Sequence, residues 1–417
     1  MTTLRLGVLR FRAPSGLEAF FFLFFFSFVT VKALSNLLLL ILVGIWLIGW
    51  FKADFRQGYW VALKESPVVW FLLALTVMIV VHTWGSAGTP EWIAHHLRKY
   101  ARLLYAVLLI MLLIPRPDWQ RSAMMGFVAA MLFVLVSTWL NLWFVLPWSA
   151  TQVTGWGHSH HVFGDYITQS IMMSLFVAIA LMFAIESQHR GQTLLWVAIV
   201  ILASVSITHL SLGRTGVLTL MVSLGTAGLL LVPRRWAFLA VLGGVAALGL
   251  ILLSSETMVS RWALALQELD NWRENTASSI GHRLFNYETA LALMLEKPWW
   301  GHGTGAFHTE ICRFVTPESE CGRFNWHPHN QFLFIGIDHG LIGVLLYLTL
   351  ITSLFRAALQ SVCRTPRVVL ACLASILTMN SMINSPLWSS IESQFFMFMA
   401  ALLVSMSWAR QPTSARQ

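Results

Sequence analysis

The feature that most constrains this chain is the repeated alternation of long apolar runs with short polar connections. A helix that crosses a bilayer needs roughly 20 mostly apolar residues, and the polar groups of a backbone in lipid must be satisfied within the chain. We therefore expect an all-α integral membrane protein with about twelve transmembrane helices, at 17–31, 34–52, 66–83, 100–115, 122–146, 167–185, 193–212, 215–232, 236–254, 331–355, 367–385 and 391–408.

Composition agrees with a chain whose solvent is the lipid bilayer. Hydrophobic residues make up 57% of the 417 residues, and charged residues only 11%, whereas soluble domains carry roughly 25% charged residues. The net charge of +9 is explained by Lys and Arg residues that flank membrane helices, as the positive-inside rule describes. We expect the lipid bilayer as a partner and no nucleic acid.

The distribution of these basic residues predicts the orientation. With a cytoplasmic N-terminus, 16 of the 27 Lys and Arg residues fall on cytoplasmic segments, which fits the rule and places both termini in the cytoplasm. The short outer connections hold five: Lys32, Arg98, Lys99, Arg102 and Arg214. The group Arg98, Lys99 and Arg102 opposes the bias. These residues either form an outer site for an anionic group or snorkel at the interface.

One long connection, residues 255–330, divides the chain. Residues 1–254 hold nine predicted transmembrane helices, and residues 331–417 hold three more and a cytoplasmic tail. Apolar residues recur at helical spacing twice within the loop, the second time after a Ser279 cap. We expect two amphipathic helices against the outer membrane face, carrying Met258, Trp262, Leu266 and Leu269, and then Leu284, Tyr287, Leu291 and Met294.

Two of the four cysteines, Cys312 and Cys321, fall in this loop. An oxidising outer compartment permits a disulfide between them. Spacing alone does not show that the two thiols meet, so a bridged and a free pair are both open.

Candidate chemistry begins where the loop ends, at His327-Pro328-His329-Asn330. Asn330 suits a helix N-cap, which places His329 at the mouth of the next helix. Gly336, Gly340 and Gly343 then follow on one helical face with His329, and small residues on that face allow another helix to approach closely. A histidine at the membrane surface, at the end of a closely packed helix face, is a candidate functional group.

Two arginines are further candidates. Arg214 lies in an outer turn, and Arg283 lies on the predicted helix at 280–296. Each is either an interfacial or solvated side chain or a fork for phosphate oxygens. The run Gly301-His302-Gly303-Thr304-Gly305 is a turn of the kind that can cradle phosphate, although it lacks the residue order of a nucleotide-binding P-loop.

Together these features resemble the O-antigen ligase family. The family pattern of His-Asn, nine residues, Gly, two residues and Gly is matched by His329-Asn330, Gly340 and Gly343. Its Arg followed four residues later by Leu is matched by Arg214 and Leu218. A second Arg of the large periplasmic loop, before a Pro and a Gly-x-Gly turn, is matched by Arg283, Pro298, Gly301 and Gly303.

The resemblance implies a membrane glycosyltransferase of the bacterial inner membrane that acts at the periplasmic face. The donor would be O-antigen on undecaprenyl diphosphate, and the acceptor a hydroxyl of lipid A–core. His329 would be the base, Arg214 and Arg283 would bind the diphosphate, and His327 would be a secondary residue. The resemblance implies no metal, ATP or other cofactor. Without a secure carboxylate nucleophile, we expect direct displacement with inversion.

Two other functions are open. O-antigen polymerases also use lipid-diphosphate donors, but their acceptor is another lipid-linked glycan. A flippase for lipid-linked glycans suits twelve helices, although the two halves show no repeat of the kind common in transporters.

Further polar residues have no assigned role. His158, His160 and His161 indicate either a metal site or a solvated loop. Asp338 and His339 fall inside the helix at 331–355, where ionisable residues are candidates for function, and either line a site or pair with their surroundings.

Overall fold

The computed structural model describes residues 15–233 and 253–408, with single residues and short stretches between 235 and 249. The described chain is helical and contains no strand. Its helices are α1 Gly16–Thr30, α2 Lys32–Trp50, α3 Ala53–Glu65, α4 Pro67–Val81, α5 Pro90–Leu113, α6 Pro117–Leu140, α7 Tyr166–Glu186, α8 Arg190–His209, α9 Arg214–Leu231, α11 Glu256–Asp270, α12 Ser279–Glu296, α13 Phe307–Glu310, α14 Gln331–Gln360, α15 Arg364–Ile383 and α16 Ser390–Trp408, with 3-10 turns η1 Ile311–Phe314 and η2 Glu318–Arg323.

Eight of the described helices are long and apolar enough to cross a membrane, namely α2, α6, α7, α8, α9, α14, α15 and α16. A ninth span is possible if α3 and α4, bent by 82° at their junction, count as one. The chain is therefore a multi-pass membrane protein, but the count of twelve is not confirmed. The predicted span at 236–254 lies mostly outside the described residues.

Three of the helices begin with proline, at Pro67, Pro90 and Pro117. Proline suits the first turn because that position has no intrahelical use for an N–H. Helix α5 is longer than expected and starts ten residues before position 100. Its polar first half, which holds Arg98, Lys99 and Arg102, is therefore helical.

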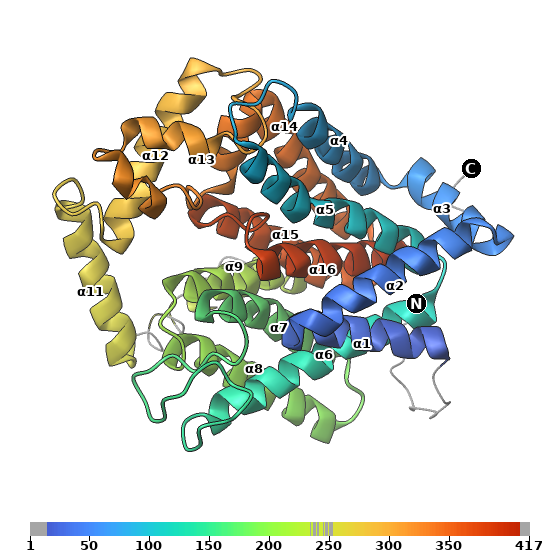
Figure 1. Cartoon of the computed structure of the whole chain (residues 1–417). Coiled ribbons are helices and arrows are strands. Elements are labelled where there is room, and N and C mark those ends of the chain that lie inside the picture. Colours follow the sequence, from blue (N-terminus) through green and yellow to red (C-terminus); the bar gives the residue numbers. More distant parts are fainter. Residues whose placement is uncertain are drawn as a thin grey trace.

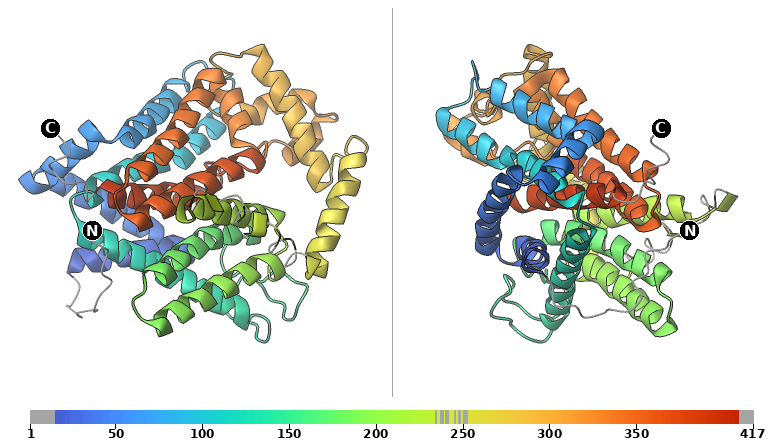
Figure 2. Two further views of the ribbon diagram at one scale, coloured as in Figure 1. Left: turned by 180° about the vertical axis from the view of Figure 1, so that it is seen from behind. Right: turned by 90° about the vertical axis from the view of Figure 1, so that its right-hand side faces the viewer.

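Figure 1 shows the bundle helices running side by side, with α11 and α12 at one end and α3 at the opposite end. The view from behind in Figure 2 shows the same separation. We call the end with α11–α13 the loop end. Helices α7 and α16 form the centre, because 89% and 83% of their apolar windows are buried by neighbouring helices.

The two amphipathic helices predicted in the long loop are confirmed as α11 and α12. The cap of α12 is corrected by one residue, since the Ser278 side chain accepts the hydrogen bond from Gly281 N. Helix α12 packs across the start of α14, where a Cβ added to Gly336 would lie 2.4 Å from Met294 Cε. This close approach fixes α12, and with it Arg283, over the mouth of α14.

Candidate active site

Arg214 is the first residue of α9, and its position is set by tight packing of that helix. A Cβ added to Gly216 would lie 2.4 Å from Ser170 Cβ of α7, so only glycine allows this approach. The Arg214 guanidinium donates to Arg261 O of α11 at 3.2 Å and to Ser279 Oγ of α12 at 3.4 Å. Arg214 thus connects the bundle to both loop helices, with the half-buried Leu218 one turn further along α9.

Arg283 lies half-buried on α12, close enough to Arg214 for the two positive charges to repel each other. Neither guanidinium forms an ion pair with a described residue. Glu268 acts on both charges only from a longer distance, and its Oε2 accepts a hydrogen bond from Ile280 N. Two like charges without a bound counterion cost energy, so the pair is suited to an anion that brings two negative groups.

His329 is held in an unusual backbone conformation at the start of α14. Its φ is +54°, in the left-handed region that non-glycine residues seldom adopt. The predicted N-cap is confirmed, because Asn330 Oδ1 accepts hydrogen bonds from Phe332 N at 2.9 Å and Leu333 N at 3.1 Å. His329 N also donates to His327 Nδ1 at 3.2 Å. Such strain is stored most often at functional sites.

The His329 ring lies among other titratable groups. Its centroid is 4.1 Å from that of His327 and 5.3 Å from that of His282. Burial lowers the pKa of His329 far below its usual value, and the charges of His327, Arg283 and His282 lower it further. Burial, followed by the charges of His282, Arg283, His308 and Lys99, lowers the pKa of His327 to about 3. Both rings are neutral at physiological pH, and a neutral imidazole can accept a proton.

The structure brings the three residues singled out in the sequence to one place. The charge of Arg283 acts both on Arg214 and on His329, although the three residues come from α9, α12 and the start of α14. The described ring atoms of His329 make no hydrogen bond, and only the backbone of this residue is engaged, by Tyr287 Oη and by His327. In this arrangement a neutral base has one cation, Arg283, as its neighbour, and this cation has a second, Arg214, as its own neighbour.

We expected the glycines of α14 to lie on one face of an unbroken helix. This expectation is wrong at Gly340, where the helix is broken, with φ of +65° and ψ of −167°. At Gly340 the approaching element is the loop segment 298–303, whereas at Gly336 it is a helix, α12. Leu341 N donates to Pro298 O at 2.7 Å, and His302 N donates to Ile337 O at 2.8 Å. A Cβ on Gly340 would lie 2.3 Å from Trp299 C, so the break needs glycine.

The glycine-rich turn has a structural use that excludes the phosphate cradle. Its glycines 301, 303 and 305 all have positive φ, but their neighbourhood is filled by α14, by Ser86 and by the start of α5. Gly303 N donates to Asp338 O, and Gly305 N donates to Asp338 Oδ2 at 3.0 Å. A Cβ on Gly301 would lie 2.5 Å from His339 N, and one on Gly343 would lie 2.5 Å from His339 Cβ. These N–H groups are therefore not free for a ligand.

Asp338 anchors this part of the loop. Its Oδ1 accepts a hydrogen bond from Phe307 N at 3.0 Å, and its Oδ2 lies 3.2 Å from His96 Nδ1 of α5. His96 Nε2 in turn lies 2.9 Å from His308 Nε2. Asp338 thus pairs with its surroundings and joins α14 to α13 and α5. His339 also pairs, with its Nδ1 3.1 Å from His82 Nδ1.

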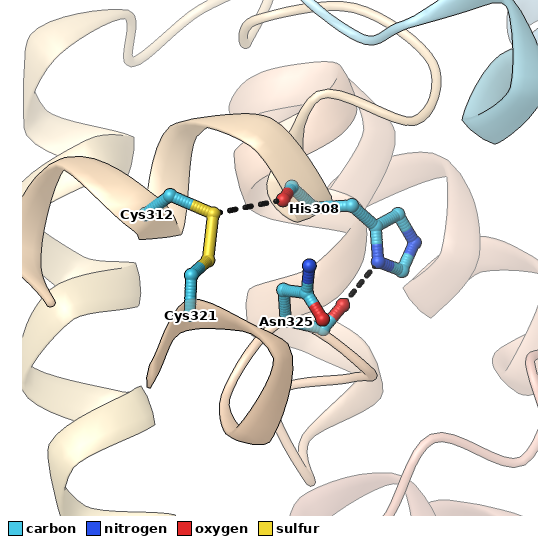
Figure 3. The surroundings of a disulfide bond; sticks show 4 residues. All are labelled: His308, Cys312, Cys321 and Asn325. Carbon is cyan, nitrogen blue, oxygen red and sulfur yellow. Dashed lines mark hydrogen bonds between the residues drawn. A yellow bond between two sulfur atoms is a disulfide. The ribbon is translucent and has the colours of Figure 1, made fainter. Parts of the chain in front are cut away.

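Cys312 and Cys321 are joined by a disulfide, at a Cα–Cα distance of 5.1 Å. Figure 3 shows the bond between the two short turns that follow α13. Cys312 Sγ lies 3.4 Å from His308 O, and His308 Nδ1 donates to Asn325 O. The bridge therefore braces the segment that leads from His308 towards His327.

The remaining histidine candidates lie in the loop at 147–166. Among the histidines of the loop at 147–166, His160 is fully buried, with Nε2 at 2.7 Å from Gly155 O, and His161 Nδ1 is 3.2 Å from Thr151 Oγ1. These contacts give both rings a role in the fold of the loop, which is less solvated than expected, and His158 is exposed.

Among the described residues, one group has the spacing of metal ligands: Glu296, His302 and Glu310. Arg313 pairs with both carboxylates, at 2.9 and 2.6 Å. A guanidinium already compensates this charge, so the group is explained without an ion.

Several residues of the site were missed by sequence reasoning. Tyr287 was assigned only to an apolar stripe, yet its hydroxyl holds the backbone of His329. His282, His96 and His308 carry no local pattern, because their partners are remote in sequence. A single sequence contains no signal that identifies these three histidines, and only the tertiary structure reveals them.

The fold and the site together define a multi-pass helical membrane protein with its polar chemistry gathered at one end, around a neutral histidine and two arginines. Residues 199–348 match the family model described as O-antigen ligase, so this part of the chain is similar to that family. The match spans Arg214, Arg283 and His329, and it indicates a membrane enzyme of the glycosyltransferase type, of the ligase or polymerase kind. No curated protein matches the chain significantly.

Proposed function

We propose that this protein is an O-antigen ligase. It transfers polysaccharide from undecaprenyl diphosphate to a hydroxyl of lipid A–core, at the periplasmic face of the bacterial inner membrane. The observation that carries the proposal is the pair Arg214 and Arg283, which lack a described ion-pair partner and of which Arg283 acts on a neutral His329, all within the matched segment.

In this reaction His329 accepts the proton of the acceptor hydroxyl, and the hydroxyl oxygen attacks the anomeric carbon. The bond from that carbon to the diphosphate oxygen breaks, and undecaprenyl diphosphate leaves with the electron pair. Arg214 and Arg283 stabilise the charge that develops on the leaving group through charge-assisted hydrogen bonds. A single displacement without a covalent intermediate inverts the anomeric centre.

The electrostatics couple donor binding to the base. In the free protein burial, the neighbouring His327 and the positive charge of Arg283 together lower the pKa of His329, which makes the ring a weak base. A diphosphate bound at Arg283 offsets this charge, because opposite charges nearby favour the protonated imidazole. His329 therefore becomes a stronger base when the donor is in place, which suppresses proton abstraction in its absence.

The proposed orientation places the loop end in the periplasm and both termini in the cytoplasm. Three features support it. The basic residues of the short connections follow the positive-inside rule, α3 lies at the end away from the loop (Figure 1), and the Cys312–Cys321 disulfide suits an oxidising compartment.

The test is complementation of a ligase-deficient bacterial host, with lipopolysaccharide resolved on a gel and protein abundance measured in the membrane fraction. Wild type should restore the polymer ladder on lipid A–core, and His329→Ala at equal abundance should not. His158→Ala, which removes an exposed histidine, is the matched control and should restore the ladder.

Two results would count against the proposal. If wild type lengthens lipid-linked chains but attaches none to the core, the protein is a polymerase. If His329→Ala restores the ladder fully, the family assignment stands, but the base is another residue.

A further inference from the structure

A second group of cations lies at the loop end, outside the site described above. It consists of Arg98, Lys99 and Arg102 on α5 and Lys32 at the start of α2, and we call it the α5 basic cluster. Lys32, Arg98 and Arg102 all lie close enough to Lys99 to repel its charge. Lys99 and Arg102 are half-buried, although α5 continues directly into the apolar bundle.

The cluster is not neutralised by the protein. Lys99 Nζ donates to Ser390 Oγ at 2.6 Å and lies 5.4 Å from the ring centre of Trp388. Arg98 and Arg102 donate only to backbone carbonyl groups of their own helix. None of the four forms an ion pair with a described carboxylate. A snorkelling lysine extends into water, whereas Lys99 is turned onto the start of α16.

The α5 basic cluster is electrostatically connected to the candidate active site. The charges of Lys99 and Arg283 both act on His327, and the His327 ring lies 4.1 Å from that of His329. For His329, the acting charges include Arg283 but not Lys99. His327, beside His329, is therefore within electrostatic reach of both Arg283 and Lys99 of the α5 basic cluster.

This arrangement of cations around the two histidines suits an inverting transfer. The attacking hydroxyl must approach the anomeric carbon from the face opposite to the leaving diphosphate. If Arg214 and Arg283 hold the diphosphate, the acceptor reaches His329 from the side of His327, where the α5 basic cluster lies. Cations without partners on that side are suited to an anionic group carried by the acceptor.

We propose that the α5 basic cluster binds a phosphate group on the acceptor glycolipid and so positions its hydroxyl at His329. This inference rests on the proposed function and names the chemistry of its acceptor side. Lys99 and Arg102 are positioning residues in this scheme, since they touch neither the anomeric carbon nor the leaving group.

The test uses the full chain in vesicles of neutral phosphatidylcholine, with a lipid-diphosphate glycan donor and with lipid A–core acceptor either phosphorylated or dephosphorylated. Lys99→Gln/Arg102→Gln should raise the KM for phosphorylated acceptor by about tenfold or more, the size expected for loss of charge-assisted hydrogen bonds, and leave the KM for donor unchanged. Wild type and variant should have the same KM for dephosphorylated acceptor.

Two variants control for folding and for net charge. Lys99→Arg keeps the charge and should retain the wild-type KM. Arg273→Gln removes a cation that is paired with Glu288 on the same end of the molecule and should change neither KM. The inference is wrong if the double variant raises the KM for both acceptors equally. It is also wrong if the variant raises the KM for neither acceptor, which is the result expected of a cluster that only contacts bilayer phospholipids.

Failure of the proposed function gives a different pattern. In that case wild type forms no product on either acceptor, and binding of the phosphorylated acceptor to the vesicles is measured instead. Retained binding that the double variant weakens about tenfold supports the anion site without the ligase reaction. Equal binding by wild type and variant overturns the inference.

Discussion

The hydroxyl of Tyr287 on α12 donates a hydrogen bond to the backbone oxygen of His329 at 2.9 Å. The same hydroxyl lies 3.0 Å from Met382 O near the end of α15. Asn330 Nδ2 donates to the same Met382 oxygen at 3.1 Å. Three helices thus meet around the strained His329, which explains how its left-handed backbone is maintained.

This relationship predicts the effect of Tyr287→Phe. Loss of the hydroxyl leaves the His329 carbonyl without its partner, which costs about 1 kcal/mol and frees the imidazole to move. Because a small misplacement of a reacting group can reduce a rate by about a hundredfold, we expect ligation to fall by roughly ten- to a hundredfold. The measurement is the initial rate of polymer transfer in vesicles at equal protein abundance.

Tyr59→Phe is the matched control, since Tyr59 also donates to a carbonyl group, Trp46 O at 3.0 Å, but lies on α3 at the opposite end. It should leave transfer unchanged. A wild-type rate for Tyr287→Phe would show that the position of His329 does not depend on this bond.

A second prediction concerns the shape of the cation at Arg283. Arg283→Lys keeps the charge but loses the planar fork that contacts two phosphate oxygens. We expect the transfer rate to fall at least about tenfold, and Arg283→Ala to fall further. Arg273→Lys, at an exposed and paired position, is the control. Equal rates for Arg283→Lys and wild type would mean that only the charge matters.

A third prediction tests the break in α14. Gly340→Ala introduces a Cβ at a position with φ of +65° and 2.3 Å from Trp299 C. The left-handed conformation alone costs about 1–2 kcal/mol for a non-glycine residue, and the clash adds to it. We expect a lower apparent melting temperature in detergent and a lower membrane abundance. Gly322→Ala meets nothing within 4 Å and should match wild type.

The sequence predicted those features that depend on interactions between residues close to one another in the chain. The stripes of α11 and α12 and the Asn330 cap were predicted, because each rests on residues within a few positions of one another. The amphipathic α3 was missed, since its polar first turn resembles a connection.

The break at Gly340 illustrates what one sequence cannot supply. A glycine within an apolar run fits an unbroken helix, and only the docking of segment 298–303 onto the α14 backbone selects the broken form. The contact between His96 and His308 spans 212 positions and has no periodicity. The grouping of Arg214, Arg283 and His329 came from resemblance, and their proximity from the structure.

A fourth prediction concerns the disulfide. The bridge closes a loop with a sequence separation of 9, for which chain entropy gives about 2.5 kcal/mol of stabilisation. The double variant Cys312→Ser/Cys321→Ser should therefore melt at a lower temperature than wild type. Cys363→Ser, which removes a cysteine outside the bridge, is the control. Alkylation of wild type by a thiol reagent before reduction should leave Cys312 and Cys321 unmodified, and modification there would disprove the bridge.

The fifth prediction is a loss of stability in mild acid. Burial lowers the pKa of His308 to about 3, whereas an unfolded histidine titrates near 6.5. Below pH 6.5 the unfolded chain therefore binds a proton that the folded chain does not, so the stability contributed by the neutral ring is complete above this pH. It is lost by about 1.4 kcal/mol per pH unit between 6.5 and 3.

The measurement is the apparent melting temperature in detergent at pH 7.5 and pH 5.5. Wild type should melt at a lower temperature at pH 5.5, and His308→Gln should show a smaller difference between the two pH values, because its side chain does not titrate. His189→Gln, at an exposed position, should keep the wild-type difference. The lowered pKa values of His282, His327 and His329, all outside the spans and due mainly to burial, act in the same direction, so His308→Gln should reduce the pH dependence without removing it. An unchanged difference in His308→Gln would mean that protonation of this buried ring does not limit the stability of the loop end in acid.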